Sequence, residues 1–353
     1  MDTITDAAPL APTIRHEMRF EGSGGEYFKI WIVNLALTIV TLGIFSAWAK
    51  VRNKRYFYGN TYIGEHNFDY HGQPLRILLG RVIALVLLLG YTATIHFVPA
   101  ATFVWALLFL FGAPWLIVSA LRFNARNTSY RNIRFNFTGT YGGAFGAYFL
   151  WPLLVGITLF TTFPLARRAR DRFNINNHVF GGQHFHTEIA GAAMYKIYGI
   201  ATAMFVGAVA VASMGYLLLK NLSSMLENPI VLVPAMLLGG ALYALCALFI
   251  TTFINTSVFN LVVGNTRLAD RFGLESTLEP VDLTWLIFSN LFMTLLTLGL
   301  YYPWAKVSVA QYRAEHFAVT GPAEVDGFMS DFVTGQGAIG EEIASFFDVD
   351  IGL

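Results

Sequence analysis

The chain has few charged residues. Asp, Glu, Lys and Arg make up only 13% of its 353 residues, whereas 55% are apolar. A soluble protein normally carries about 25% charged residues, so this sequence has too little polar surface to enclose a water-soluble core. Its net charge of +1 gives no sign of the basic surface that binds nucleic acid. We therefore expect a membrane protein without a nucleic-acid partner.

Cysteine and catalytic motifs are also scarce. The single Cys246 lies inside an apolar run, which excludes a disulfide framework. The first twenty residues have neither a basic start nor an apolar core, so we expect no cleavable signal peptide. There is no Walker loop, no Gly-x-Ser-x-Gly elbow and no His-Glu-x-x-His motif. We expect neither an enzyme nor a cofactor.

Histidines offer only a weak metal signal. His184 and His186 would share one face of a strand, a spacing compatible with a metal. No cysteine and no carboxylate stands at a matching spacing. We therefore expect no metal site and interpret these residues as solvent-facing. The same interpretation applies to His66, His71 and His178.

What the chain does contain is a segment that occurs three times. Residues 20–70 align without a gap on residues 137–187, and TLGIFSAWAKV at 41–51 returns as TLGLYYPWAKV at 297–307. Each copy is an apolar run followed by basic residues. A repeated apolar segment of this kind is typical of membrane architectures.

Seven apolar stretches are long enough, or nearly so, to cross about 30 Å of hydrocarbon at 1.5 Å per residue. Aromatic and β-branched segments with glycines accompany the repeats and predict small β-hairpins. The predicted fold class is a membrane all-α protein: a polytopic bundle of about seven apolar helices, with interfacial hairpins and three repeat copies. The stretches are 29–49, 75–97, 101–121, 143–166, 195–219, 230–254 and 283–304.

The predicted domain organisation is a single membrane domain over residues 18–322. A disordered lead at 1–17 precedes it, and an acidic tail at 323–353 follows it. The repeat copies span 18–73, 135–190 and 276–322, and helical hairpins at 75–121 and 195–254 separate them.

Two topologies remain open. If all seven stretches cross the membrane, the basic residues divide almost evenly between the two faces. If only the two hairpins cross and the repeat helices are re-entrant, every one of the 23 Lys and Arg residues except Lys220 shares a face. The positive-inside rule favours the second arrangement. The length of 143–166, and the need to shield a re-entrant backbone from lipid, favour the first.

The basic clusters are the first candidate sites. Tryptophan and cations at the end of an apolar helix are typical of a membrane boundary, so simple anchoring is one interpretation. Clustered cations beside a bilayer also attract anionic lipid, so a headgroup site is the other. The candidates are Trp48, Lys50, Arg52, Lys54, Arg55, Arg167, Arg168, Arg170, Arg172, Trp304 and Lys306.

Polar residues inside the apolar stretches are the second candidates. Asn34 and Asn290 occupy equivalent repeat positions, where an amide needs a partner: another helix or a substrate. Helix breakers stand near the basic ends, at Gly43, Pro164, Gly299 and Pro303. No apolar stretch contains a central Asp or Glu, which weakens the case for a proton-coupled transporter.

The segments TLGIFSAWAKVRNKRYFYGNT, NTSYRNIRFNFTG, TLGLYYPWAKV and FFDVDIGL together resemble the YjgN-like family of bacterial inner-membrane proteins. The resemblance covers nearly the whole chain, although Leu165-Ala166-Arg167 replaces Trp-Ala-Lys in the second copy. It implies a multi-pass protein of the bacterial cytoplasmic (inner) membrane, but no mechanism.

Two functions remain open. The first is a transporter or channel-like protein for a small solute or lipid. The second is a non-catalytic membrane scaffold or envelope-associated protein that binds anionic lipid. The expected partners are membrane lipids, including anionic phospholipid, and a homo-oligomer stays open.

Overall fold

The structure is a computed structural model that describes residues 13–221 and 229–322. The expected acidic tail at 323–353 lies outside these residues, as do the first twelve residues of the expected lead. The first strand begins at Thr13, so residues 13–17 of that lead belong to a strand.

The described residues form short strands that alternate with pairs of helices. The strands are β1 (Thr13–Phe20), β2 (Thr61–Ile63), β3 (His66–Tyr70), β4 (Thr128–Tyr130), β5 (Ile133–Phe137), β6 (His178–Phe180), β7 (Gln183–Thr187), β8 (Thr266–Leu268), β9 (Phe272–Ser276) and β10 (Phe317–Pro322). The helices are α1 (Gly24–Val40), α2 (Ser46–Gly59), α3 (Pro74–Phe97), α4 (Ala101–Arg126), α5 (Tyr141–Phe145), the π-helical turn η1 (Gly146–Leu150), α6 (Trp151–Ile157), α7 (Phe163–Asn176), α8 (Gly191–Asn221), α10 (Pro229–Gly264), α11 (Pro280–Leu296) and α12 (Tyr302–Glu315).

The ten described strands close into a barrel in which every neighbouring pair is antiparallel. The two ends of the chain meet in it, because β1 pairs with β10 from Thr13↔Pro322 to Glu17↔Ala318. The other edge of β1 pairs with β2, where Met18 lies opposite Ile63. Closure leaves the barrel without an exposed edge strand.

The predicted fold class is therefore wrong. The expectation was a bundle of about seven apolar helices with separate small hairpins, but the hairpins join into one closed barrel. Only four of the described helices are long and apolar enough to cross a membrane. The pair β1 with β10 connects segments about 300 residues apart, and each of the other joining pairs connects strands separated by a helix pair. Such long-range pairs leave no local sequence pattern.

The order strand, helix pair, strand occurs five times in the described chain. Every odd-numbered strand leads into a helix pair, and every even-numbered strand leads away from one. Because the neighbours are antiparallel, all five helix pairs leave the barrel at one rim and return to that rim. The strand-to-strand turns occupy the opposite rim. The three similar sequence segments fall in the first, third and fifth of these units.

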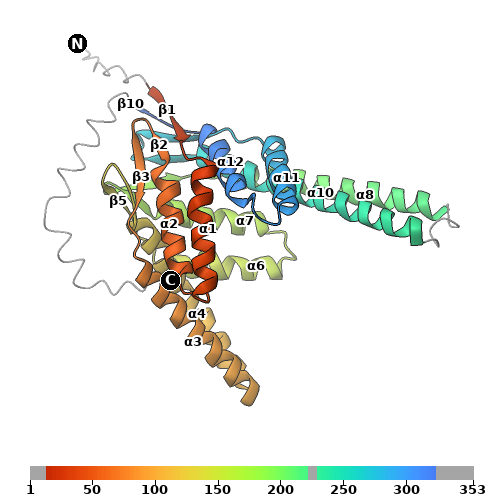
Figure 1. Cartoon of the computed structure of the whole chain (residues 1–353), viewed down its shortest axis with the longest axis horizontal. Coiled ribbons are helices and arrows are strands. Elements are labelled where there is room, and N and C mark those ends of the chain that lie inside the picture. The colour runs from red at the N-terminus through yellow and green to blue at the C-terminus, as the bar shows by residue number, and fades with distance from the viewer. Residues whose placement is uncertain (1–12, 222–228, 323–353) are drawn as a thin grey trace, which may run out of the picture.

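The five helix pairs pack side by side in a ring at the barrel rim from which they leave. The second helix of each unit contacts the first helix of the next: α2 with α3, α4 with α5, α7 with α8 and α10 with α11. The ring closes where α12 contacts α1. Figure 1 shows α3 with α4, and α8 with α10, extending well beyond the other helices and diverging from each other.

The remaining three pairs are short because the chain reverses inside each apolar run. In the first copy α1 ends at Val40, Leu42 and Gly43 adopt positive φ angles of 48° and 92°, and α2 begins at Ser46. The Gly43 amide donates to the Thr38 carbonyl over 2.8 Å and closes the turn. The corresponding turns hold Leu159 and Leu298, at φ 49° and 51°.

These reversals contradict the topology in which all seven stretches cross. Stretches 29–49, 143–166 and 283–304 each contain a helix, a turn and the start of a second helix that runs back. The candidate spans in the described chain are α3, α4, α8 and α10, and at most 11% of each span's most apolar window is buried inside the protein. Their apolar side chains therefore face outward, as lipid requires.

Hydrogen bonds at the strand–helix joints join the two strands of the first, second, third and fifth units. The Glu21 amide donates to the Asn60 carbonyl over 2.9 Å, joining the end of β1 to the start of β2. The same bond recurs from His71 to Asn127 and from Thr138 to Asn177. In each unit, the side chain of the residue just after the second helix also hydrogen-bonds to the backbone carbonyl four residues earlier. These residues are Asn60, Asn127, Asn177, Asn265 and His316.

A second set of bonds joins each unit to the next. In each, a side chain of the second helix donates to a backbone carbonyl at the strand–helix joint that follows. The last one, from Gln311 to Gly22 over 3.3 Å, links the fifth unit to the first. The others are Arg55 to Tyr70, Arg122 to Phe137, Arg168 to Ile189 and Asn260 to Leu278.

We expect Gly139→Ala to destabilise the fold by about 1 to 3 kcal/mol, because overpacking a filled core costs this much. A Cβ at Gly139 would lie 2.4 Å from the ring of Phe137 and 2.9 Å from Phe173. Phe137 is only 1% exposed and cannot move aside. Gly142→Ala is the matched control, since nothing lies within 4 Å of its Cβ. Thermal unfolding in detergent should rank Gly139→Ala well below Gly142→Ala; equal melting temperatures would contradict this packing.

Candidate functional site

The barrel interior is lined by at least one apolar side chain from each of the ten described strands. Alternate residues of a strand point to the same face. Inward positions of neighbouring strands lie side by side, as in Met18↔Ile63 and Phe68↔Tyr130, and so on around the ring. We call this set the lumen ring. Its members are Met18, Ile63, Phe68, Tyr130, Phe135, Phe180, Phe185, Leu268, Leu274 and Val319.

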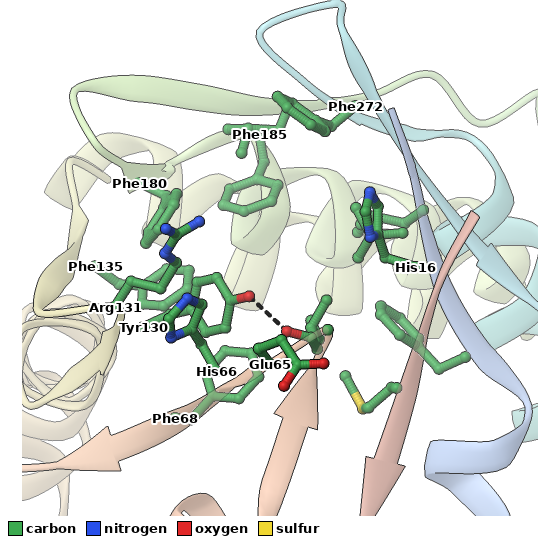
Figure 2. A pocket seen from close by; sticks show the side chains of 17 residues that line it. His16, Glu65, His66, Phe68, Tyr130, Arg131, Phe135, Phe180, Phe185 and Phe272 are labelled. Carbon is green, nitrogen blue, oxygen red and sulfur yellow. Dashed lines mark hydrogen bonds between the residues drawn. The ribbon is translucent and has the colours of Figure 1, made fainter. Parts of the chain in front are cut away.

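Aromatic rings dominate one side of the lumen. Figure 2 shows Phe68, Tyr130, Phe135, Phe180 and Phe185 converging from neighbouring strands. The ring centroids of Phe135 and Phe180 are 4.6 Å apart, and those of Phe68 and Tyr130 are 5.0 Å apart. These distances are typical of favourable aromatic contacts. The Tyr130 hydroxyl donates to the Ile63 carbonyl over 2.7 Å, which satisfies its polar end.

The lumen ring encloses a cavity of about 500 Å³. This volume lies within the range of roughly 300 to 1,000 Å³ found for small-molecule sites. Barrels of eight strands already hold one small ligand, so a ten-strand barrel has room for one. Because its lining is mainly apolar, water gains few hydrogen bonds in the cavity. The lumen therefore suits an apolar guest.

Polar groups gather at the rim where the strand-to-strand turns lie. Glu65 and Arg131 line the cavity from the β2–β3 and β4–β5 turns. His66 lines it from the start of β3, and His16 lines it from β1. The His16 Nε2 atom is buried and has no hydrogen-bond partner among the described residues. The mouth of the lumen thus offers hydrogen-bonding and charged groups above an apolar chamber.

Buried side chains separate the lumen from the helices. The layer of inward positions next to the helix ring contains Tyr70 opposite Thr128 and Phe137 opposite His178. Tyr70 and Phe137 are almost fully buried. Burial raises the pKa of the Tyr70 hydroxyl to about 12, so this phenol stays neutral at physiological pH.

The first basic cluster does not converge on one point. Arg52 Nη1 donates to the Asn34 Oδ1 atom over 3.0 Å, Lys54 Nζ donates to the Asn124 Oδ1 atom over 2.6 Å, and Arg55 Nε donates to the Tyr70 carbonyl over 3.2 Å. These partners lie on different elements: α1, α4 and β3. Arg52 ties the two helices of its own unit together, whereas Lys54 and Arg55 link this unit to the next.

Lys50 and Lys54 are poorly solvated cations inside this region. Burial, and to a smaller extent Lys50, lowers the pKa of the Lys54 ammonium to about 8. Burial first and Arg81 second lower the pKa of Lys50. Arg81 itself donates to the Ser46 hydroxyl.

The second and third clusters are also engaged in contacts within the protein. Arg167 forms an ion pair with Asp171 at 2.9 Å, and Arg168 donates to the Ile189 carbonyl. Lys306 Nζ lies 4.8 Å from the centroid of Phe57 and 5.5 Å from that of Tyr27. The tryptophans of the repeat motif contact aromatic neighbours, Trp48 with Phe45 and Trp304 with Phe28. Arg170 and Arg172 lie on α7.

The two asparagines of the repeated apolar stretches bond within their own helix pairs. Asn34 is 3% exposed and donates to the Asn53 side chain over 3.0 Å. Asn290 is 7% exposed and donates to the Ser308 hydroxyl over 2.9 Å. Each amide therefore ties the first helix of its pair to the second.

The two histidines considered for a metal, His184 and His186, contact different partners. His184 contacts the Asn176 carbonyl at 3.3 Å, and His186 contacts Glu188 at 3.3 Å. Within residues 13–221 and 229–322, no group of three or more His, Cys, Asp or Glu side chains is placed to hold a metal ion.

The lumen ring was missed by the sequence analysis. Its residues stand in short segments that the sequence predicts to be interfacial hairpins. A three-residue strand does not show which distant strand it pairs with, so the sequence does not predict that these hairpins enclose a chamber.

A closed barrel with long apolar helix pairs projecting from one rim defines this chain as a membrane protein whose barrel encloses a ligand-sized cavity. It belongs to the family described as "Bacterial protein of unknown function (DUF898)", which matches residues 15–346. It is 24% identical to the inner membrane protein YjgN of Salmonella typhimurium, over 87% of this chain and 89% of that protein. It is 31% identical to the Escherichia coli YjgN over 42% of this chain and 37% of that protein. No solved structure matches the chain.

The lowered pKa of Lys54 predicts a pH-dependent stability. Below about pH 8 the ammonium is charged in both folded and unfolded chains. Between about 8 and the ordinary 10.5, only the folded chain releases the proton, so the free energy of unfolding should rise with pH. Lys54→Arg stays charged and should lose this rise. Chemical unfolding in detergent between pH 7.5 and 9.5 measures both slopes; parallel slopes would show that Lys54 does not titrate in this window.

Proposed function

We propose that this chain is a multi-pass inner-membrane protein that binds a lipid-like or other small apolar solute in its barrel and carries it to or from the membrane. It would act as a carrier or channel-like protein rather than an enzyme. The observation that carries the proposal is the lumen ring, to which all ten described strands contribute an apolar side chain around about 500 Å³.

The chemistry of the chamber favours an amphipathic ligand. An apolar body would gain from leaving water and contacting the aromatic rings of the lumen. A polar or charged end would reach His16, His66 or Arg131 at the mouth. A fully polar solute would gain little from this lining. A medium-chain or long-chain lipid fragment with one polar end fits both features.

The position of the barrel supports membrane delivery. The barrel rim that carries the helices lies next to the bilayer if α3, α4, α8 and α10 cross it. The three short pairs would then dip into the hydrocarbon and return, with Leu42 and Leu298, each 94% exposed, at their tips. The positive-inside rule then assigns the barrel to the cytoplasm, since every Lys and Arg except Lys220 lies on its side or in helices that begin there.

This topology predicts the accessibility of two positions. In a Cys246→Ala background, Ala100→Cys, in the α3–α4 loop, should react with a membrane-impermeant thiol reagent applied to intact spheroplasts. Glu65→Cys, at a barrel turn, should react only after lysis. Labelling both before and after lysis provides the control for intrinsic reactivity. Reaction of both positions from the outside would contradict a cytoplasmic barrel with membrane-crossing hairpins.

The lumen ligand can be tested with adjacent residues of one strand. Met18 points into the lumen, whereas Glu17 points outward. Met18→Trp should fill the chamber and reduce crosslinking of a diazirine-bearing palmitic acid to barrel peptides by about tenfold or more, which corresponds to about 1.4 kcal/mol of lost binding. Glu17→Trp is the matched control and should crosslink like the wild type. Mass spectrometry of the crosslinked peptides gives the measurement.

Two results of that experiment would reject the lumen as the binding site. In the first, the crosslinks of the wild type are confined to the helices. In the second, Met18→Trp has a normal melting temperature but crosslinks to barrel peptides as strongly as the wild type does.

A second candidate function is a membrane scaffold that binds anionic lipid without transport. One observation favours it: the lumen and the cavity between the helices have no lining residue in common. A carrier would need to open the buried layer around Tyr70 and Phe137, whereas a scaffold would not.

A further inference from the structure

A second cavity of about 480 Å³ lies within the helix ring, between α7, α10, α11 and α12. It faces the interior of the ring, because it is lined by the second helices of the third, fourth and fifth units, and α8, which stands between α7 and α10 in the ring, does not line it. Its α10 residues run from Asn255 to Val263, in the last turns before the barrel. We call it the ring cavity.

The charged groups of the ring cavity leave a positive charge in excess. Arg167 and Asp171 neutralise each other in an ion pair at 2.9 Å. Arg313 of α12 also lines the cavity and has no carboxylate partner in the described ranges. An arginine guanidinium has five donors in a planar fork that suits a phosphate or carboxylate group.

A buried hydroxyl in the same lining lacks a partner. Thr256 is 2% exposed, and its Oγ1 atom has no hydrogen-bond partner in the described part of the chain. Threonines in helices commonly return this hydroxyl to the carbonyl four residues earlier, as Thr38 does to Asn34 and Thr294 does to Asn290. A buried group of this kind calls for a ligand or another explanation.

Neutral donors complete the lining. Asn255 and Asn174 contribute side-chain amides to the cavity wall. The Asn174 Oδ1 atom accepts from the Tyr148 hydroxyl over 2.7 Å, which leaves its NH₂ group as the end available for an acceptor. An unpaired arginine, an orphaned hydroxyl and amide donors together describe an anion site with several hydrogen-bond donors.

We propose that the ring cavity binds a phosphate-type oxyanion, supplied by the headgroup of an anionic phospholipid. Arg313 provides the compensating charge, and Thr256 donates its hydroxyl. The cavity stands at the barrel-side end of the candidate span α10, which is the depth of lipid phosphates if that helix crosses the bilayer. This inference rests on the proposed membrane placement and is independent of the lumen ligand.

The test counts phosphatidylglycerol retained by the full chain after gentle purification, using native mass spectrometry. Arg313→Gln should weaken retention about tenfold, because a charge-assisted contact is lost. Thr256→Val should weaken it several-fold while the lipid-free melting temperature stays equal or rises, since an unpaired buried hydroxyl is removed. Lys29→Gln, which removes an exposed cation on α1, is the control and should retain lipid fully.

A second arm separates the two sources of the anion. Lipid-depleted protein in neutral detergent is titrated with inorganic phosphate, and the melting temperature is followed. Loss of phosphatidylglycerol in both variants without a response to inorganic phosphate supports a lipid headgroup. A phosphate-induced rise that Thr256→Val abolishes supports the anion site with a soluble ligand instead.

Equal lipid retention in the wild type and both variants, with no response to inorganic phosphate, would overturn the proposal. The lumen is assessed separately, because Met18→Trp should retain its phosphatidylglycerol. Failure of fatty-acid crosslinking in the barrel would therefore contradict the lumen proposal without affecting the ring-cavity proposal. Unchanged phosphatidylglycerol retention in the ring-cavity variants would likewise not affect the lumen proposal.

Discussion

The pairing of β1 with β10 is the constraint on which the rest of the structure depends. Strands of three to eight residues are too short to be stable alone, and each gains stability only from two neighbours. Closing the ring between residues 13–20 and 317–322 gives every strand both neighbours. The bond from Gln311 to Gly22 repeats this closure at the level of the helices. Without it the five units would form an open sheet with two exposed edges.

Closure also decides where the chemistry lies. Because every helix pair leaves from one rim, the molecule has an apolar chamber on one side and a helix ring on the other. The cations that mark the repeat helices are used largely within this ring: Arg55 holds the next unit, and Arg52 and Lys54 bond to amides of other helices. Juxtamembrane basic residues can therefore serve as ties between units, and their number alone does not identify a lipid site.

The same order of elements supports two kinds of helix pair. Short pairs turn back within an apolar run, at a left-handed leucine followed by glycine or phenylalanine. In the long pairs, each helix continues for 24 to 36 residues. Since both kinds return to the same joint, helix length can vary without disturbing the barrel. This separates the part that enters the membrane from the part that forms the chamber.

The sequence by itself determined that the chain is a membrane protein, because its low charge and long apolar runs cannot be reconciled with water. It also determined the family and the positions of the two long hairpins. It did not determine the barrel: pairing between strands is long-range, and three-residue segments such as Thr61–Ile63 carry no pattern that names a partner. The reversals at Leu42 and Leu298 were hidden for a similar reason, since an apolar turn in lipid looks like a continuing helix. Only the tertiary structure decided which residues face the lumen, because burial there depends on closure of the whole ring.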